Sequence, residues 1–347
     1  MSEPLMIAEQ GDFWTGLTRR EHASGTVAGP AMYVRYQIPV DARPYPIVLV
    51  HGGGGQGTDY LSTPDGRPGW ATRLLQMGFA VYTVDRPGFG RSPYHPDVLG
   101  PVPPPPTYEQ ISARFAAPAK AGGYPQARLH DQWPGGGEIG DPALDTFMAS
   151  QAANPLDLAA TQELMRTCGA ELLDRIGPAI LMTHSMGGAF GWVVADARPG
   201  LVKSIIAVEP IGPPFLRFPG GDGLPWGLTA IPLTYDPPAA DASELATEVR
   251  PAPGPDLLDC TVQAEPARRL PNLSGFPIVV VTAEASWIAQ HDHGVVDFLT
   301  QAGVNAEHLR LEELGIHGNG HVMMGEKNSD EVLGAIVGWL DGHLETE

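Results

Sequence analysis

The sequence contains little cysteine and few basic residues for its length. Only two of its 347 residues are cysteines, Cys168 and Cys260, which is too few for a disulfide framework. Its 21 lysines and arginines stand against 40 aspartates and glutamates, giving a net charge of -19. Because nucleic acids and anionic membranes bind through basic patches, this deficit argues against both as partners. No stretch approaches the ~18 consecutive apolar residues of a membrane span, so we expect a soluble protein.

The N-terminal residues also lack the pattern of a secretory leader. Residues 1–16 contain no basic segment followed by an apolar one, and a leader needs both. We therefore expect a cytoplasmic protein. The length allows a single domain, residues 1–347, that carries insertions and buries a large core.

Short apolar runs alternate with helical patterns along the chain. Expected strands cover 32–38, 46–50, 79–85, 179–184, 202–208, 278–282 and 308–311, and expected helices cover 70–77, 159–176, 186–197, 294–301 and 330–344. Repeated units of this kind predict an α/β fold, with a mostly parallel sheet covered by helices on both faces. Residues 32–38 alternate in polarity, which predicts an edge strand.

The apolar run 179–182 leads directly into Thr183-His184-Ser185-Met186-Gly187 and then into a helical pattern. This layout is typical of the nucleophile elbow of α/β hydrolases, in which small residues on both sides of a serine let it sit on a sharp strand-to-helix turn. Gly187 supplies one small position, and Thr183 stands where the common pattern has glycine. A serine at such a junction can also be a simple helix N-cap, so the elbow depends on its partners.

A glycine-rich loop follows the strand 46–50, where this fold places its oxyanion donors. The residues at 51–55 are His-Gly-Gly-Gly-Gly, and glycines let backbone N–H groups approach a substrate oxygen. We assign the N–H groups of Gly53 and Met186 to the oxyanion hole, with Gly54 as the substitute for Gly53. A phosphate-binding loop is the rival interpretation, but the lysine and Ser/Thr of that motif are missing.

The general base and its acid partner each have two candidates. His317 and His321 both lie in the loop before the last helix, and the Gly-Asn-Gly turn between them favours His321 as the base, with His317 ordering the loop. Glu209 and Glu284 each follow a strand, and a carboxylate at either strand end could orient the imidazole. Position alone favours Glu284 slightly, so the acid stays open on these grounds.

Several motifs resemble a small family of bacterial serine esterases typified by the Alcaligenes esterase, to which sulfonylurea-herbicide de-esterifying esterases are related. They are MYVRYQIP at 32–39, TPDGR at 63–67, GFGRS at 88–92, HS at 184–185, VEP at 208–210 and HGNGH at 317–321. The resemblance implies an α/β-hydrolase fold, Glu209 as the acid, His321 as the base and a homodimer. It also implies export, because the relatives are exported. Adjacent cysteines of the Alcaligenes enzyme are replaced here by Gly53 and Gly54.

Two long segments, about 92–154 and 211–275, interrupt the alternation and are rich in proline. Because both leave strand ends beside the predicted elbow, we interpret them as lid insertions over the substrate pocket. The alternative is a pair of solvated excursions without a substrate role. Their aromatic residues predict an apolar pocket, although core packing explains them equally well: Tyr94, Tyr108, Trp133, Phe215 and Trp226.

Together these residues predict a serine carboxylic-ester hydrolase. Ser185, His321 and Glu209 would act through an acyl-enzyme on a small or medium ester, apolar or aromatic, without a metal or organic cofactor. A lactonase, thioesterase or acyltransferase on the same fold is the alternative. A metal-dependent hydrolase is a further one, because four histidines have spacings found in metal sites: His291, His293, His317 and His321.

Overall fold

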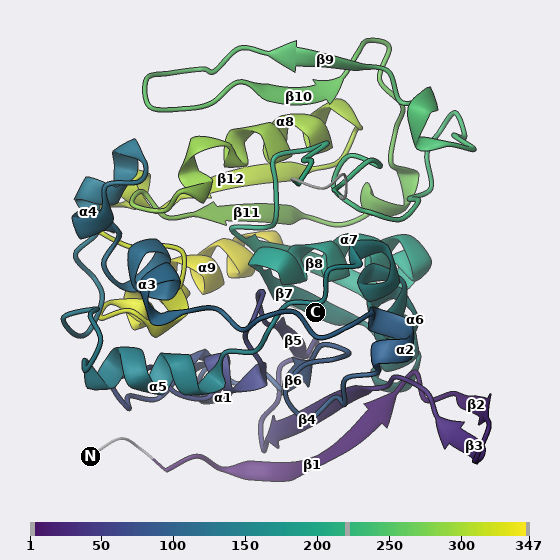
Figure 1. Ribbon diagram of the computed structural model, residues 1–347, viewed down its shortest axis with the longest axis horizontal. Helices are drawn as coiled ribbons and strands as arrows, with labels where there is room; N and C mark the ends of the chain where they lie inside the picture. The colour runs from purple at the N-terminus through teal and green to yellow at the C-terminus, as the bar shows by residue number, and fades with distance from the viewer. Residues whose placement is uncertain (1–3, 219–222, 345–347) are drawn as a thin grey trace.

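The computed structural model describes residues 4–218 and 223–344, in which eight strands form one sheet in the order β1-β4-β6-β5-β7-β8-β11-β12 (Figure 1). The strands are β1 (Ile7–Thr15), β4 (Met32–Pro39), β5 (Ile47–Val50), β6 (Val81–Asp85), β7 (Ala179–His184), β8 (Val202–Val208), β11 (Ile278–Thr282) and β12 (Ala306–Arg310). Strand β4 runs antiparallel to both neighbours, and the remaining pairs are parallel. The predicted mostly parallel sheet is thus confirmed.

Strand β4 is not at the edge, contrary to the prediction. The edge is formed by β1, which pairs with β4 along its whole length. Most side chains of β1 are solvent-exposed, and only Phe13 and Thr15 are buried, so β1 carries no apolar pattern that reveals it. A short hairpin, β2 (Arg19–His22) and β3 (Gly25–Ala28), extends from the same side of the molecule.

Helices cover both faces of the sheet, as predicted. Side chains of β5 alternate between two cores: Val48 and Val50 pack with α6 (Leu158–Ile176), α7 (Gly188–Ala197) and α8 (Asp292–Gln301), while Ile47 and Leu49 pack with α1 (Trp70–Gln76) and α9 (Ser329–His343). All four side chains of the strand are buried. This explains why β5 reads as a continuous apolar run and not as an alternating one.

The two insertions contain short elements that the sequence did not predict. The first carries α2 (Pro96–Leu99), α3 (Tyr108–Ile111), α4 (Pro118–Ala121) and α5 (Pro142–Ser150). The second carries a hairpin of β9 (Thr247–Arg250) and β10 (Cys260–Gln263), which lies beside α8 (Figure 1). Four residues of the second insertion, 219–222, lie outside the described residues. Apart from α5, which has nine residues, these helices and strands have four residues each, too few to show a periodicity.

Both cysteines are buried, and neither forms a disulfide. Cys168 belongs to α6 and its side chain packs into the core, which agrees with a structural thiol. Within residues 4–218 and 223–344, no helix is long and apolar enough to cross a membrane.

Candidate active site

Ser185 occupies a sharp turn between β7 and α7. Its φ of 51° lies in the left-handed region, a conformation that costs energy in a residue other than glycine and is found at strained nucleophile turns. A Cβ added to Gly187 would lie 2.4 Å from the carbonyl oxygen of His51, so glycine is required there. Thr183 finds room against α7, where a Cβ added to Gly191 would lie 3.5 Å from Thr183 Cγ2.

The glycine loop after β5 borders this turn. A Cβ added to Gly53 would lie 2.9 Å from Met186 Cγ, and both residues line the same cavity as Ser185. The N–H of Gly54 already donates to Asn154 Oδ1 at 2.8 Å. Gly53 is therefore better placed than Gly54 to donate to a substrate oxygen.

A buried polar network fixes the direction of that donor. Arg86 Nη2 and His51 Nδ1 both donate to the Gly52 carbonyl, at 2.6 and 2.9 Å, and the Arg86 N–H donates to His51 Nε2 at 2.9 Å. Burial, aided by Arg86, lowers the pKa of His51 well below its usual value, so the ring stays neutral and keeps Nε2 as an acceptor. Because the Gly52 carbonyl and the Gly53 N–H share one peptide plane, holding the carbonyl orients the N–H.

His321 and Glu209 come together from segments 112 residues apart in the sequence. His321 Nδ1 lies 2.5 Å from Glu209 Oε2, and both side chains are buried. Glu209, directly after β8, also accepts hydrogen bonds from Ser286 Oγ at 2.7 Å and from the Ala283 N–H at 2.9 Å. A carboxylate held in this way keeps the imidazole proton on Nδ1 and leaves Nε2 as an acceptor.

The other two candidates form a separate, outer pair. His317 Nδ1 lies 3.1 Å from Glu284 Oε2, and the His317 side chain is 62% exposed. Glu284 Oε1 also accepts the N–H of Gly318 at 2.8 Å. His317 therefore orders the loop, as the sequence suggested, and Glu284 lies beside this histidine instead of beside His321.

The surroundings of His321 favour its neutral form. Burial lowers the pKa of His321, and the guanidinium of Arg114 lowers it further. Burial raises the pKa of Glu209, while the Ser286 and Ala283 donors act in the opposite direction. A neutral imidazole is the form that can take a proton from a serine hydroxyl.

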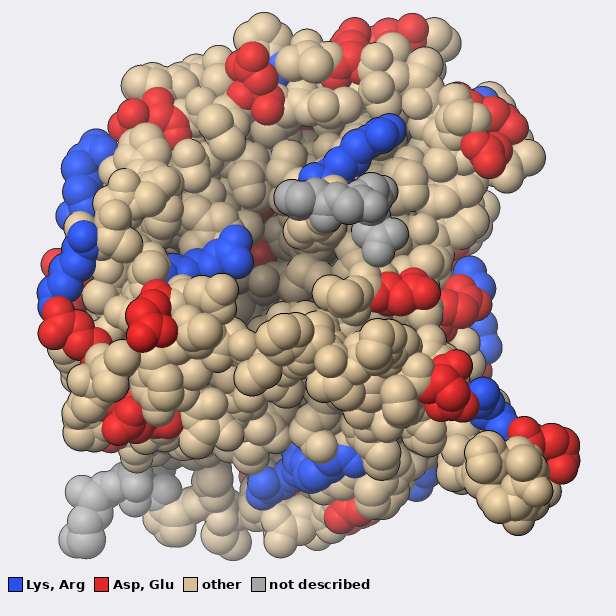
Figure 2. Space-filling model, viewed as in Figure 1, with Lys and Arg blue, Asp and Glu red and all other residues tan. Residues whose placement is uncertain are grey.

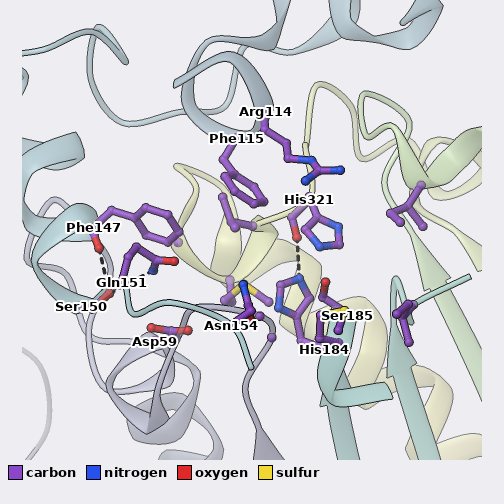
Figure 3. Close-up of a pocket in the computed structure, with 18 of the residues that line it drawn as sticks. Asp59, Arg114, Phe115, Phe147, Ser150, Gln151, Asn154, His184, Ser185 and His321 are labelled. Carbon is purple, nitrogen blue, oxygen red and sulfur yellow. Dashed lines mark hydrogen bonds between the residues drawn. The ribbon is translucent and has the colours of Figure 1, made fainter. Parts of the chain in front are cut away.

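The rings around His321 restrict its movement. The Trp287 ring lies 4.3 Å from the His321 ring between centroids, and the Phe115 ring lies 5.8 Å away in a stacked arrangement. His184 Nε2 donates to the His321 carbonyl at 2.9 Å (Figure 3). No hydrogen bond joins Ser185 to His321 among the described residues, but both face the cavity, and such pairs often tighten only when substrate binds.

The loop that carries His321 is also tied to the first insertion. The buried carboxylate of Glu326 accepts hydrogen bonds from Asn319 Nδ2, from the Gly320 N–H and, at 2.8 Å, from His130 Nε2. The Asp131 N–H donates to the carbonyl of Gly318, which belongs to the same loop, at 3.1 Å. The insertion and the histidine loop therefore form one packed unit.

Ser185 opens into a cavity of about 1000 Å³. Both insertions and the loop after β11 contribute to its wall, which includes the aromatic residues Phe115, Phe147, Phe218 and Trp287. In the face shown, the surface is hollowed near the centre of the view, and most residues around the hollow are uncharged (Figure 2). The volume suits a small or medium organic molecule.

The aromatic residues singled out from the sequence are not the ones in the wall. The described lining contains none of Tyr94, Tyr108, Trp133, Phe215 and Trp226. Trp133 and Trp226 are instead buried within the two cores, so the apolar character of the wall comes from other aromatic residues than these five. Core packing, the alternative explanation, applies to these two tryptophans.

The described residues bring no three His, Cys, Asp or Glu side chains into an arrangement that could hold a metal. In this part of the chain, His291, His293, His317 and His321 do not form such a ligand group. Each of three rings has another neighbour: His321 has Glu209, His317 has Glu284, and His293 Nε2 lies 3.5 Å from Cys260 Sγ.

Sequence reasoning missed several residues that support the site but lie far from Ser185 in the sequence. Trp287, Arg114 and Glu326 belong to segments whose patterns are loop-like, and no motif surrounds them. His184 lies directly before Ser185, and this position is the one signal in the sequence that could have marked it as a site residue. Its hydrogen bond to the His321 carbonyl depends on the fold and could not be predicted.

Comparison with known proteins places the chain in a family. A profile described as the alpha/beta hydrolase fold matches residues 45–220, a range that includes β5, the glycine loop, the Ser185 turn and Glu209. The chain belongs to the α/β-hydrolase family. The fold predicted from the sequence is thus confirmed.

Individual relatives of this α/β hydrolase support the same conclusion. It is 42% identical over 323 residues to a protein named "Probable secreted lipase phiG" from Fungal sp. (strain ATCC 74256), covering 92% of this chain and 88% of that protein. A structure described as that of a novel bacterial esterase matches with a TM-score of 0.62 and 24% identity, covering 99% of this chain and 98% of that one. At that identity the structural match shows the fold alone.

Proposed function

We propose that this α/β hydrolase is a serine carboxylic-ester hydrolase acting through an acyl-enzyme. The observation that carries the proposal is the buried Glu209–His321 pair, whose histidine faces the same cavity as Ser185 on its strained turn. A relative with 42% identity bears the name of a lipase, whose substrates are esters. The full-length match to that relative supports ester hydrolysis over another reaction of the fold.

The acylation step follows from these positions. His321 Nε2 takes the proton of Ser185 Oγ as the oxygen attacks the ester carbonyl, and the C=O π electrons move onto the carbonyl oxygen. The N–H groups of Gly53 and Met186 donate to that oxyanion. When the intermediate collapses, the C–O bond to the alcohol breaks and His321 returns the proton to the leaving oxygen.

Deacylation uses the same groups with water as the nucleophile. His321 removes a proton from water, whose oxygen attacks the acyl-enzyme carbonyl; the Ser185 Oγ–C bond then breaks, and Oγ regains the proton. In both steps Glu209 stabilises the imidazolium that forms for a short time. Ser185, His321, the leaving alcohol and water thus account for each proton that is transferred.

The two insertions, about 92–154 and 211–275, act in this proposal as lids of a single domain, residues 1–347. Phe115 and Phe147 come from the first insertion, and Ile211 and Leu216 from the second, and all four line the cavity. Contributions from both segments support an ester with apolar or aromatic parts. The compartment and the homodimer stay predictions, and the relative with 42% identity is called secreted.

The proposal is tested by covalent labelling of Ser185. A fluorophosphonate should add one phosphonyl group per chain, located on the peptide that contains Ser185, and hydrolysis of p-nitrophenyl butyrate should stop in proportion to labelling. Intact-mass and peptide mass spectrometry measure the adduct. In Ser185→Ala the adduct should be absent, and a labelled Ser185→Ala protein, or an unlabelled active wild type, would contradict the proposal.

The pH dependence should reflect the lowered pKa of His321. Neutral His321 is the active form, so kcat/KM should fall as the pH drops through a pKa that lies below the usual 6.5. Arg114→Gln removes a cation that lowers this pKa, and the acid limb should move to higher pH by up to about one unit. The measurement is a pH profile of kcat/KM for p-nitrophenyl butyrate. Arg128→Gln, an exposed charge removal outside the cavity lining, should leave the limb in place.

A further inference from the structure

One acidic and one basic side chain, Asp59 and Arg114, stand among the described residues that line the cavity. Arg114 lies over the Trp287 ring, with 4.6 Å from guanidinium carbon to ring centroid, and on the His321 side of the site (Figure 3). Asp59 lies on the other side, below Gln151 in the same view. The cavity wall therefore has an acidic and a basic side chain in different places, and Ser185 lies on the side of His321 and Arg114 in this view (Figure 3).

Asp59 ends a row of side-chain oxygens that face the glycine loop. A Cβ added to Gly53 would meet Asn154 Oδ1 at 2.9 Å, one on Gly54 would meet Gln151 Oε1 at 2.8 Å, and one on Gly55 would meet a carboxylate oxygen of Asp59. The row begins beside the proposed oxyanion donor. Glycine at all three positions leaves space for these oxygens next to the backbone.

Among the described residues, the N–H of Gln56 and the charge of Arg86 favour the ionised form of the Asp59 carboxyl group. In the part of the chain that the structure describes, no side chain donates to it or pairs with it, while Asp65 and Asp85 each have an arginine partner. Burial raises the pKa of Asp59 to about 7, an effect that the N–H of Gln56 partly opposes. A desolvated carboxyl that lines a cavity gains from a hydrogen-bond donor placed against it.

The position of Asp59 relative to His321 indicates which part of the ester, the acyl or the alcohol portion, lies near its carboxyl group. His321 protonates the leaving oxygen, so the alcohol portion lies toward His321 and Arg114, and the acyl portion extends the other way. Gly53 and Gly55 are two positions apart in the sequence, which limits their Cα atoms to about 7 Å apart. A group a few bonds from the carbonyl carbon can therefore reach Asp59 while the carbonyl oxygen stays at Gly53.

We propose that Asp59 determines specificity by binding a hydroxyl or ammonium donor on the acyl portion of the ester, close to the carbonyl. This proposal rests on the esterase function proposed above. The preferred substrates would be esters whose acyl group carries a hydrogen-bond donor near the carbonyl. Esters of plain alkyl acids of the same shape would be poorer substrates. The charge-assisted hydrogen bond should favour such esters by about tenfold to a hundredfold.

Three esters of one size test the assignment: ethyl 3-hydroxybutyrate, ethyl 3-aminobutyrate and ethyl 3-methylbutyrate. The quantity measured is kcat/KM for each donor ester divided by kcat/KM for ethyl 3-methylbutyrate, so a general loss of activity in a variant cancels. The wild type should prefer both donor esters. Asp59→Leu should lose both preferences about tenfold or more, and the isosteric Asp59→Asn should lose chiefly the preference for the ammonium ester.

Asp12→Asn is the matched control, because it removes one exposed carboxylate on β1 far from the cavity lining and should keep the wild-type ratios. Equal efficiency with all three esters in the wild type, or ratios that survive in both Asp59 variants, would overturn the role of Asp59 and leave the esterase function standing. A wild type that hydrolyses none of the three, and does not label with fluorophosphonate, would overturn both.

Discussion

His321→Ala should reduce kcat for p-nitrophenyl butyrate by about 10⁴-fold or more, because the variant loses both the acceptor for the Ser185 proton and the donor to the leaving alcohol. His321 is buried against Glu209, Trp287 and His184, and none of these groups takes the place of its Nε2 as the proton acceptor. Steady-state kinetics measures the loss, with fluorophosphonate labelling, which should also slow, as a second readout.

The matched control is His317→Ala, four residues away in the same loop. Its imidazole is exposed and paired with Glu284, and such surface pairs contribute little, about 0–1 kcal/mol. Activity should stay within about threefold of the wild type, with a small fall in Tm. A larger loss in His317→Ala than in His321→Ala would reverse the assignment of the base.

Glu209→Gln should lower kcat by about 10²- to 10⁴-fold without unfolding the protein. The amide has nearly the same shape, but it carries no charge to stabilise the imidazolium, and its NH₂ group can face His321 Nδ1 and force the wrong tautomer. The carboxylate accepts three hydrogen bonds within the protein, from His321, Ser286 and Ala283. Thermal unfolding by circular dichroism should separate a loss of catalysis from a loss of structure.

Glu284→Gln provides the comparison, since Glu284 was the acid that position alone favoured. Glutamine keeps an oxygen that can accept the Gly318 N–H, and the hydrogen-bond partners of Glu284 among the described residues are His317 and Gly318, not His321. Its kcat should stay within about threefold of the wild type. If Glu284→Gln were the more damaging substitution, the acid assigned here would be wrong.

The proposed nucleophile and base could be singled out in the sequence because each lies in a local pattern with a chemical meaning. Ser185 follows an apolar run and precedes Gly187, and His321 follows a Gly-Asn-Gly turn. The acid could not be decided locally, because Glu209 and Glu284 follow β8 and β11, which are neighbouring parallel strands of one sheet. Their carboxylates therefore start from the same edge, and only the packing of the loop 317–321 brings one histidine to each.

The features that sequence analysis missed depend on contacts between distant segments. Strand β1 has mostly exposed side chains and is specified by its pairing with β4. Asp59 has no motif around it, and its position in the cavity depends on the glycine loop against which it packs. Trp133 shows the opposite error: an aromatic residue in a loop-like segment suggested a pocket, although its side chain fills the core.

The bonds that join His130 and Asp131 to the loop around His321 bear on how the enzyme could be re-engineered. Exchanging the first insertion for that of a homologue, a common route to new substrate profiles, would leave Glu326 buried without its imidazole partner. Grafts should therefore keep residues 130–132, or transfer them together with 317–327. A chimera that takes these two segments from different proteins would lose hydrogen bonds that hold the loop of the proposed base, His321. This loss would occur whatever substrate the new cavity lining accepts.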